Sequence, residues 1–387
     1  MTQRSPFLLV IFLGLVSLLG DITYEGARSI IGPYLATLGA SATVVGFVAG
    51  LGEFIGYGLR LISGYLTDKI KKYWTVTFLG YFINLISVPS LALTKTWFQA
   101  ICLVFTERIG KAIRTPARDT ILSFATSKLG RGKGFGFHEA MDQIGAIIGP
   151  IIIASILFYT ESYKLSFTIL LIPALLALLI LLFSILLYPH PQKFEKEKFS
   201  IESKIFSKGF WLYVFAIGIY GAGYADFALI AYHFKKTKIL IGSWIPVFYA
   251  IAMGIDAISA LIFGYLFDKK GFVILIFSVL ISFLFAPCVF LGDFKVSLLG
   301  MILWGIGMGA QESIMRAAIS FFILKDKRAT GYGIFNTFYG FLWFLGSFFL
   351  GILYDISIYA LIITSITLQL LSIPLLIKLS KTYLNKM

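Results

Sequence analysis

The chain is organised as a series of long apolar runs, each bounded by glycine, proline or charged residues. A helix that crosses the hydrocarbon core of a membrane needs about 20 mostly apolar residues. We expect one transmembrane helix over each of twelve runs, which are 6–37, 43–67, 73–93, 97–124, 134–159, 164–188, 209–235, 240–267, 272–291, 296–322, 331–354 and 357–378. The pattern therefore predicts an all-α polytopic membrane protein with twelve transmembrane helices.

One long polar stretch separates the sixth run from the seventh, and it reads PHPQKFEKEKFSIESKIFSKG. Its alternating lysines and glutamates predict a solvated linker, and an amphipathic helix within it is the alternative. The expected organisation is a six-helix bundle over 1–190, a cytoplasmic linker over 191–208 and a second six-helix bundle over 209–387.

The composition narrows the class of protein. Of the 387 residues, 58% are hydrophobic and 13% are charged, whereas soluble domains contain roughly 25% charged residues. This balance excludes a water-soluble enzyme, a disordered chain and a nucleic-acid binder, despite a net charge of +14. The two cysteines lie in apolar runs, so no disulfide framework, metal site or cofactor is predicted.

The positive charge predicts the orientation of the chain in the membrane, because cytoplasmic loops retain Lys and Arg. Of the 33 Lys and Arg residues, 20 fall in the terminal segments and loops on the side of the N-terminus, 6 in the opposite loops and 7 inside runs. We therefore expect a cell-membrane protein with both termini in the cytoplasm. The loop with Lys235, Lys236 and Lys238 departs from this bias.

The two halves repeat a short motif. GYLTDKIKK begins at Gly64 and GYLFDKKGF at Gly264, each after the second run of its half. Two equivalent six-helix halves are a recurrent plan in transporters, with the substrate bound between the repeats. A small residue allows helices to approach closely, and Asp68 or Asp268 can sit at a positive helix N-terminus near Thr330 or Lys133.

These motifs resemble those of the major facilitator superfamily across essentially the whole chain. Gly64, Asp68 and Lys69 match the loop signature G-x-x-x-D-[RK]-x-x-[RK]-[RK], and Gly264 with Asp268 is a shortened copy. GAIIGP, Gly145–Pro150, resembles the antiporter signature G-x-x-x-G-P, but Ile-Ile-Ile-Ala follows it. The resemblance implies two pseudo-symmetric six-helix bundles and gating roles for Gly64, Asp68, Lys69, Arg118, Gly145, Gly149, Pro150, Gly264 and Asp268.

Ionisable residues inside the apolar runs are costly unless they face a cavity or each other. Asp21, Glu25 and Arg28 lie on one face of the first helix, at i, i+4 and i+7. Six charged residues of the fourth run fall within an arc of about 140° at 100° per residue, and they are Glu107, Arg108, Lys111, Arg114, Arg118 and Asp119. Arg108 in ERIGKAIR also resembles the family's fourth-helix motif, with Lys111 where many relatives have Gln.

The depth of these residues predicts where they meet. Asp21, Glu25, Glu53, Arg108 and Lys111 should meet near the membrane midplane, and His138 and Asp142 enter from the cytoplasmic side. A substrate or proton pathway and structural ion pairs, such as Arg114 with Asp142 or Glu53 with Arg60, are the two interpretations. The expected pathway consists of Asp21, Glu25, Arg28, Glu53, Arg108, Lys111, Arg114, His138, Asp142, Asp226, Asp256 and Glu312.

The expected function is secondary transport of a small organic solute by alternating access. A buried carboxylate beside a cation can exchange a proton, so proton-coupled antiport and efflux are favoured, with sodium as the other coupling ion and uptake of an organic anion as the alternative. The candidate residues for stacking against such a solute are aromatic, namely Tyr220, Tyr224, Phe227, Tyr232 and Trp304. The absence of H-E-x-x-H, G-x-S-x-G and P-loop motifs disfavours a membrane-embedded enzyme or an ATP-driven pump. We expect a monomer in the lipid bilayer, with no catalytic residues.

Overall fold

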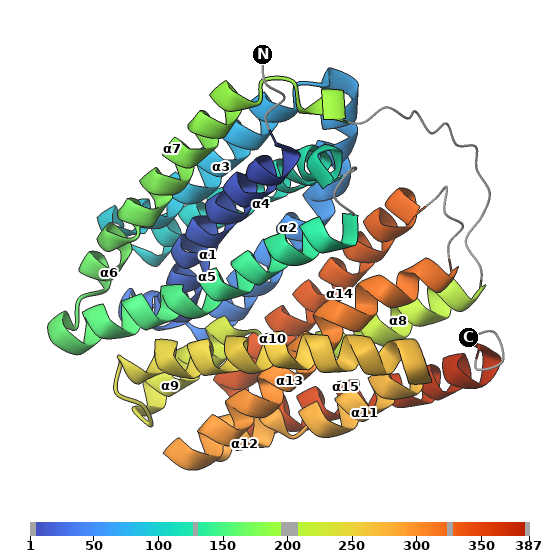
Figure 1. Ribbon diagram of the computed structural model, residues 1–387. Helices are drawn as coiled ribbons and strands as arrows, with labels where there is room; N and C mark the ends of the chain where they lie inside the picture. The colour runs from blue at the N-terminus through green and yellow to red at the C-terminus, as the bar shows by residue number, and fades with distance from the viewer. Residues whose placement is uncertain (1–4, 127–130, 195–207, 323–327, 384–387) are drawn as a thin grey trace. The chain divides into compact units, whose positions relative to one another are not determined.

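The computed structural model describes residues 5–126, 131–194, 208–322 and 328–383 (Figure 1). Within these ranges the regular secondary structure is entirely helical. The first part contains α1 Pro6–Thr37, α2 Ala42–Ile70, α3 Tyr73–Ser90, η1 Leu91–Leu93, α4 Trp97–Thr126, α5 Arg131–Thr160, α6 Tyr163–Ile169, α7 Leu171–Leu187 and η2 Pro191–Phe194. Most of the predicted linker, 195–207, lies outside the described residues.

The later helices follow the linker. They are α8 Lys208–Ala222, α9 Phe227–Thr237, α10 Trp244–Lys270, α11 Val273–Ser282, α12 Phe285–Leu291, α13 Phe294–Phe322, α14 Arg328–Ile356 and α15 Ile358–Tyr383. Three predicted spans are interrupted, because α6 and α7, α8 and α9, and α11 and α12 each divide one apolar run. The helical class of the protein is confirmed.

Eleven segments of the described chain are long and apolar enough to cross a membrane. The predicted span that is not among these eleven is the fourth, 97–124, which corresponds to α4, a helix of 30 residues. Its charged residues lower its hydropathy, so length and composition alone do not assign it to the membrane. The count of twelve spans stays a prediction.

The chain packs as two compact units. The first contains Met1–Ser29 and Gly58–Ser200, and the second contains Ile30–Tyr57 and Ile201–Met387. The end of α1 and the first half of α2 thus pack with the later helices. The predicted bundle limits, 1–190 and 209–387, stay a prediction.

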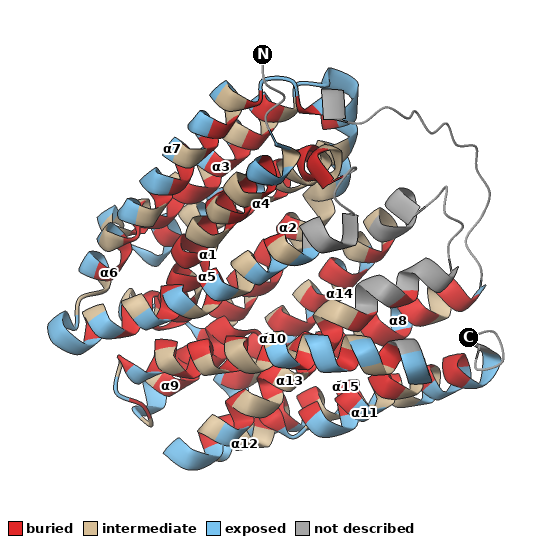
Figure 2. Ribbon diagram, in the orientation of Figure 1, coloured by how far each residue is buried: buried red, intermediate tan, exposed pale blue. Residues whose placement is uncertain are grey.

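The first unit is built around α3, which packs against both α4 and α7. Its core contains fully buried side chains of α1, α3 and α4, such as Leu13, Leu85 and Ile121. By contrast, α7 exposes a row of large apolar side chains, including Leu175, Leu179 and Leu186 (Figure 2). Such a surface is unfavourable in water and suits a lipid-facing helix.

The break between α8 and α9 lies in the interior of the second unit. Ser365 Oγ donates to the Gly223 carbonyl at 2.6 Å, and Trp304 Nε1 donates to the Ala225 carbonyl at 3.0 Å. Asp226 then caps α9 by accepting from the Ala228 amide at 2.9 Å. Unwound backbone is tolerated at membrane depth when protein groups satisfy it in this way.

The N-terminus of α2 is held by Asp355, which lies near the end of α14. One carboxylate oxygen of Asp355 accepts from the Thr43 amide at 2.8 Å and from Thr43 Oγ1 at 2.7 Å, and the other lies 3.3 Å from the Ala42 amide. These amides have no partner within their own helix. Asp355 therefore acts as an N-cap supplied by another helix.

Replacing Asp355 by Ala should lower the melting temperature of the purified protein, because the N-cap of α2 and its link to α14 are lost together. A lost cap costs about 1 kcal/mol, and the tertiary link adds to that cost. Asp293→Ala is the matched control, since Asp293 accepts from the Val296 amide of its own helix, at 2.9 Å. Equal decreases for the two variants, measured by thermal denaturation in detergent, would contradict the tertiary role.

Candidate functional site

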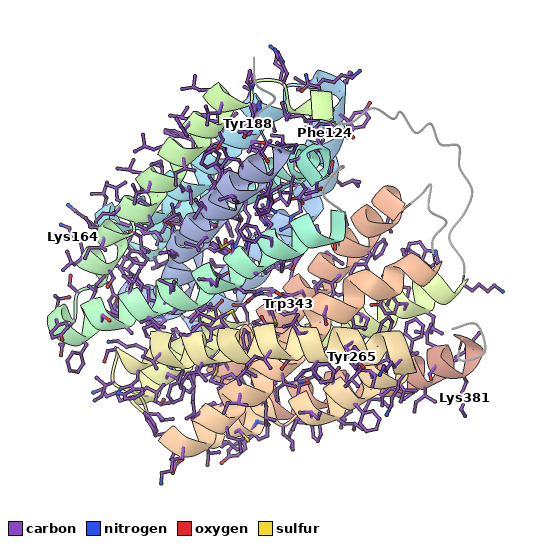
Figure 3. All side chains as sticks on the ribbon, in the orientation of Figure 1. Phe124, Lys164, Tyr188, Tyr265, Trp343 and Lys381 are labelled. Carbon is purple, nitrogen blue, oxygen red and sulfur yellow. The ribbon has the colours of Figure 1, made fainter. Side chains whose placement is uncertain are left out.

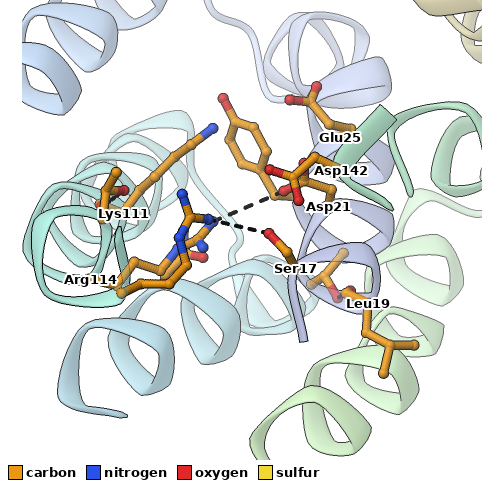
Figure 4. A network of polar contacts seen from close by, with 12 residues as sticks. Ser17, Leu19, Asp21, Glu25, Lys111, Arg114 and Asp142 are labelled. Atoms are coloured by element: carbon orange, nitrogen blue, oxygen red, sulfur yellow. Dashed lines mark hydrogen bonds and ion pairs between the residues drawn. The ribbon is translucent and has the colours of Figure 1, made fainter. Parts of the chain in front are cut away.

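A buried cluster of charged side chains forms in the first unit, where α1, α4 and α5 meet (Figure 4). Asp21, Glu25 and Asp142 face Lys111 and Arg114 across a short gap in this view. Arg114 Nη2 lies 4.0 Å from Asp21 Oδ1, and the Arg114 residue is 1% exposed. The structure thus brings together acids and bases that are far apart in the chain.

Tyr24 of α1 contacts two cations of α4, Arg108 and Lys111. The Lys111 ammonium lies 3.6 Å from the centroid of its ring, and Arg108 donates a hydrogen bond to its hydroxyl. Cations are attracted to the electron-rich face of an aromatic ring. Tyr24 therefore helps to hold two cations of α4 close to the acidic face of α1.

Sequence reasoning missed Tyr24. The available signal was its spacing, because Tyr24 follows Asp21 by three residues and therefore lies on the same face of the helix. Neighbouring pairs extend the cluster, with Arg28 Nη1 lying 3.9 Å from Glu25 Oε1 and Arg108 Nε lying 3.4 Å from Glu107 Oε2.

A chain of hydrogen bonds and ion pairs extends the cluster from Arg118 through Ser17 to Asp142. Arg118 donates to Ser17 Oγ at 3.2 Å and pairs with Asp119 at 2.8 Å. Ser17 in turn is hydrogen-bonded to Asp142, whose Oδ2 lies 3.5 Å from His138 Nδ1. Ser17 was not singled out by the sequence, since serine is common in transmembrane helices.

Four of the five residues expected to meet near the midplane lie close to one another. Asp21, Glu25, Arg108 and Lys111 come together in the first unit. Glu53 belongs to the second unit, where its charge is close to Tyr339, so its meeting with the other four stays a prediction. Arg114 is placed beside Asp21, whereas the interpretation as structural ion pairs made it a partner of Asp142. The reason is the crossing of α1 and α5, which brings Asp21 and Asp142 to the same cations.

Gly145 and Gly149 create that crossing. A Cβ atom on Gly149 would lie 2.5 Å from the Ile22 carbonyl oxygen and 2.9 Å from the Gly26 amide nitrogen, and one on Gly145 would lie 3.0 Å from the Asp21 Cβ. Only a residue without a side chain permits such close backbone contact. The two glycines thus set the position of Asp21 relative to α5. Pro150 lies inside the same helix.

The predicted gating motif lies at the end of α2, with a shortened copy near the end of α10. Asp68 and Lys69 are exposed at the end of α2, and a Cβ on Gly64 would make an ordinary 3.5 Å contact with Pro116. A Cβ on Gly264 would lie 3.9 Å from the Ser313 side chain. The side chains of Asp268, Thr330 and Lys133 lie outside the described ones, so the gating role of this motif stays a prediction.

The remaining predicted ionisable residues belong to the second unit. Asp226 is the cap of α9, and Asp256 is 1% exposed with its charge near Tyr224. The charge of Glu312 is close to Tyr339. No group of three or more His, Cys, Asp or Glu suited to a metal ion occurs among the residues that the structure describes.

The expected stacking wall is largely a packed core. Tyr220, Tyr224 and Trp304 are fully buried. The Tyr220 hydroxyl lies 2.9 Å from Ser282 Oγ, and Tyr224 donates to the Trp304 carbonyl. Both hydroxyl groups have hydrogen-bond partners inside the unit, so these aromatic residues stabilise the fold.

Substituting Gly149 by Ala should separate α1 from α5, because the added methyl group collides with α1 backbone. Overpacking of this kind costs about 1–3 kcal/mol, so both the melting temperature and the transport rate should fall. Gly136→Ala on the same helix is the control, since nothing described lies within 4 Å of its added Cβ. Similar behaviour of the two variants would show that the crossing is not tightly packed.

Comparison with known proteins supports this architecture. The model of the Major Facilitator Superfamily matches residues 10–347. An uncharacterized protein of Mycobacterium tuberculosis is 37% identical over 96% of this chain and 93% of its own length, and an uncharacterized MFS-type transporter of Methanocaldococcus jannaschii is 30% identical over 90% and 89%. The crystal structure of a bacterial homologue of the human lysosomal transporter Spinster, inward-facing and unoccupied, aligns with a TM-score of 0.76 at 14% identity, covering 100% of this chain and 99% of that one. The chain therefore belongs to the Major Facilitator Superfamily, and it is a multi-pass membrane protein of the secondary transporter class.

Proposed function

We propose that this secondary transporter exports a small organic solute in exchange for protons, by alternating access. The observation that carries the proposal is the buried cluster of Asp21, Glu25 and Asp142 with Lys111 and Arg114. The proposed location is the cell membrane, with both termini in the cytoplasm, and the proposed working form is a monomer.

The cluster can exchange a proton because its carboxylates are shared between cations. The Asp21 carboxylate interacts electrostatically with Lys111 and Arg114, and also with two other carboxylates, Glu25 and Asp142. Several close acids disfavour full ionisation of all of them, while the cations oppose that effect. A shift of α4 relative to α1 would change this balance, so proton binding can be linked to the conformational cycle.

A proton suits the cluster better than a sodium ion. Sodium requires several oxygen ligands around one point, and the ammonium of Lys111 and the guanidinium of Arg114 would repel it there. A proton needs only one carboxylate oxygen. The site composition therefore favours proton coupling.

Export is favoured over uptake of an organic anion. The stripe of Arg108, Lys111 and Arg114 would be the anion site, but the Arg108 and Arg114 guanidinium groups each lie within 4.0 Å of a carboxylate, that of Glu107 or Asp21. The Lys111 ammonium interacts electrostatically with the carboxylates of Glu25 and Asp21. An anion would have to displace these partners and leave the carboxylates buried beside it. The G-x-x-x-G-P sequence at Gly145–Pro150, typical of antiporters in this family, also supports exchange.

Asp21→Asn should abolish solute accumulation driven by an imposed pH gradient while leaving solute exchange at equal pH intact, because the amide cannot carry the proton. The assay uses purified protein in liposomes, with fluorescent reporters of internal pH and compounds identified by thermal stabilisation.

The control is Glu161→Gln, at an exposed position between α5 and α6. Normal gradient-driven accumulation in the Asp21→Asn variant would remove Asp21 from the coupling role. If neither wild-type protein nor control moves any solute against a gradient, the antiport proposal itself is wrong.

A further inference from the structure

Three neighbouring residues of the second unit lie at the edge of its aromatic packing, where the Trp343 ring centroid is 6.0 Å from that of Tyr224. Gln311 of α13 is 2% exposed, and Trp343 of α14 is 3% exposed. Tyr339 lies between them, donating from its hydroxyl to Gln311 Oε1 at 2.9 Å while its ring centroid lies 5.6 Å from that of Trp343. Trp343 is labelled in Figure 3.

Two buried nitrogens of this group have hydrogens left to donate. Neither Gln311 Nε2 nor Trp343 Nε1 has a hydrogen-bond partner of normal geometry within the described part of the protein. The Tyr220 hydroxyl lies close to the Gln311 amide, but it can accept at most one of the two hydrogens of the NH₂ group. Buried donors without partners are rare and costly, so each needs an explanation.

The surroundings are aromatic and acidic. The Tyr57 ring of α2 meets the Tyr339 ring edge-on, at a centroid distance of 6.0 Å. The carboxylates of Glu53 and Glu312 are close enough to interact electrostatically with Tyr339. Tyr57 and Glu312 are only half-buried, unlike Gln311 and Trp343.

We propose that Gln311, Tyr339 and Trp343 form a binding subsite for a planar aromatic solute that carries hydrogen-bond acceptors and is neutral or positively charged. The inference rests on the proposed transport function and specifies its substrate class. The available N–H groups select an acceptor such as a ring nitrogen or an aromatic carbonyl. The rings of Tyr339 and Trp343 provide stacking, and the two carboxylates disfavour an anion.

The test compares matched probes. 2-(Aminomethyl)quinoxaline has two ring nitrogens, and 2-(aminomethyl)naphthalene has the same shape and charge without them. Wild-type protein should bind the quinoxaline about fivefold more tightly for each of the two donors that a ring nitrogen satisfies, and quinoxaline-2-carboxylate should bind more weakly than either amine. Binding is measured by displacement of a labelled quinoxaline from the full-length protein in detergent.

Variants assign the preference to these residues. Trp343→Phe and Gln311→Met should each lower the preference for the quinoxaline about fivefold, because each deletes one of the two donors while keeping most of the side-chain volume. Trp244→Phe is the matched control, since Trp244 lies at the start of α10 and is 42% exposed.

Three results would overturn the subsite. The first is equal affinity of wild-type protein for the two amines. The second is a preference that is unchanged in both variants, and the third is no binding of either amine. The result of this binding test can be distinguished from the result of the proton-coupling test. A preference that depends on Trp343 and Gln311, found in a protein that shows no proton-driven accumulation, would refute antiport and leave the subsite in place.

Discussion

The constraint on which the structure depends is that charge inside a membrane must be neutralised by the protein itself. Neither lipid nor water solvates an ionised side chain there, so carboxylates and cations have to meet within a few ångströms. In the first unit, Asp21 and Arg114 meet at 4.0 Å, and Lys111 lies on the face of Tyr24. Removing one partner would leave a buried charge uncompensated, which is far more costly than removing both. The cluster is therefore constrained as a unit, and its sharing of cations makes it suited to coupling.

Close backbone contact between α1 and α5 positions the residues of this cluster. Gly145 and Gly149 allow α5 to touch α1 near Asp21, and that contact brings Asp142 of α5 to the same cations. The second unit uses its buried residues differently, because many of its aromatic hydroxyl and indole groups are satisfied internally. Gln311 and Trp343 are exceptions, and for that reason they are the residues assigned to the solute.

The sequence predicted the helical class, the family and the acidic and basic faces, because apolar run length and helical periodicity are local properties. It did not predict the three interruptions, between α6 and α7, between α8 and α9, and between α11 and α12. The interruption between α8 and α9 depends on tertiary hydrogen bonds such as that from Ser365 to Gly223. It also placed Tyr220 in an open stacking wall, whereas the Tyr220 side chain is buried and its hydroxyl lies 2.9 Å from Ser282 Oγ. Pairing depends on where helices cross, and a single sequence does not show whether a buried tyrosine has found an internal acceptor.

Proton-coupled export requires that binding of a solute releases a proton from the cluster at Asp21. The most direct measurement is isothermal titration of the purified protein with one bound solute in two buffers of different ionisation enthalpy, which counts the protons exchanged. We expect release of about one proton from wild-type protein and none from Asp21→Asn. Binding without proton exchange in wild-type protein, or identical release in both proteins, would contradict this coupling.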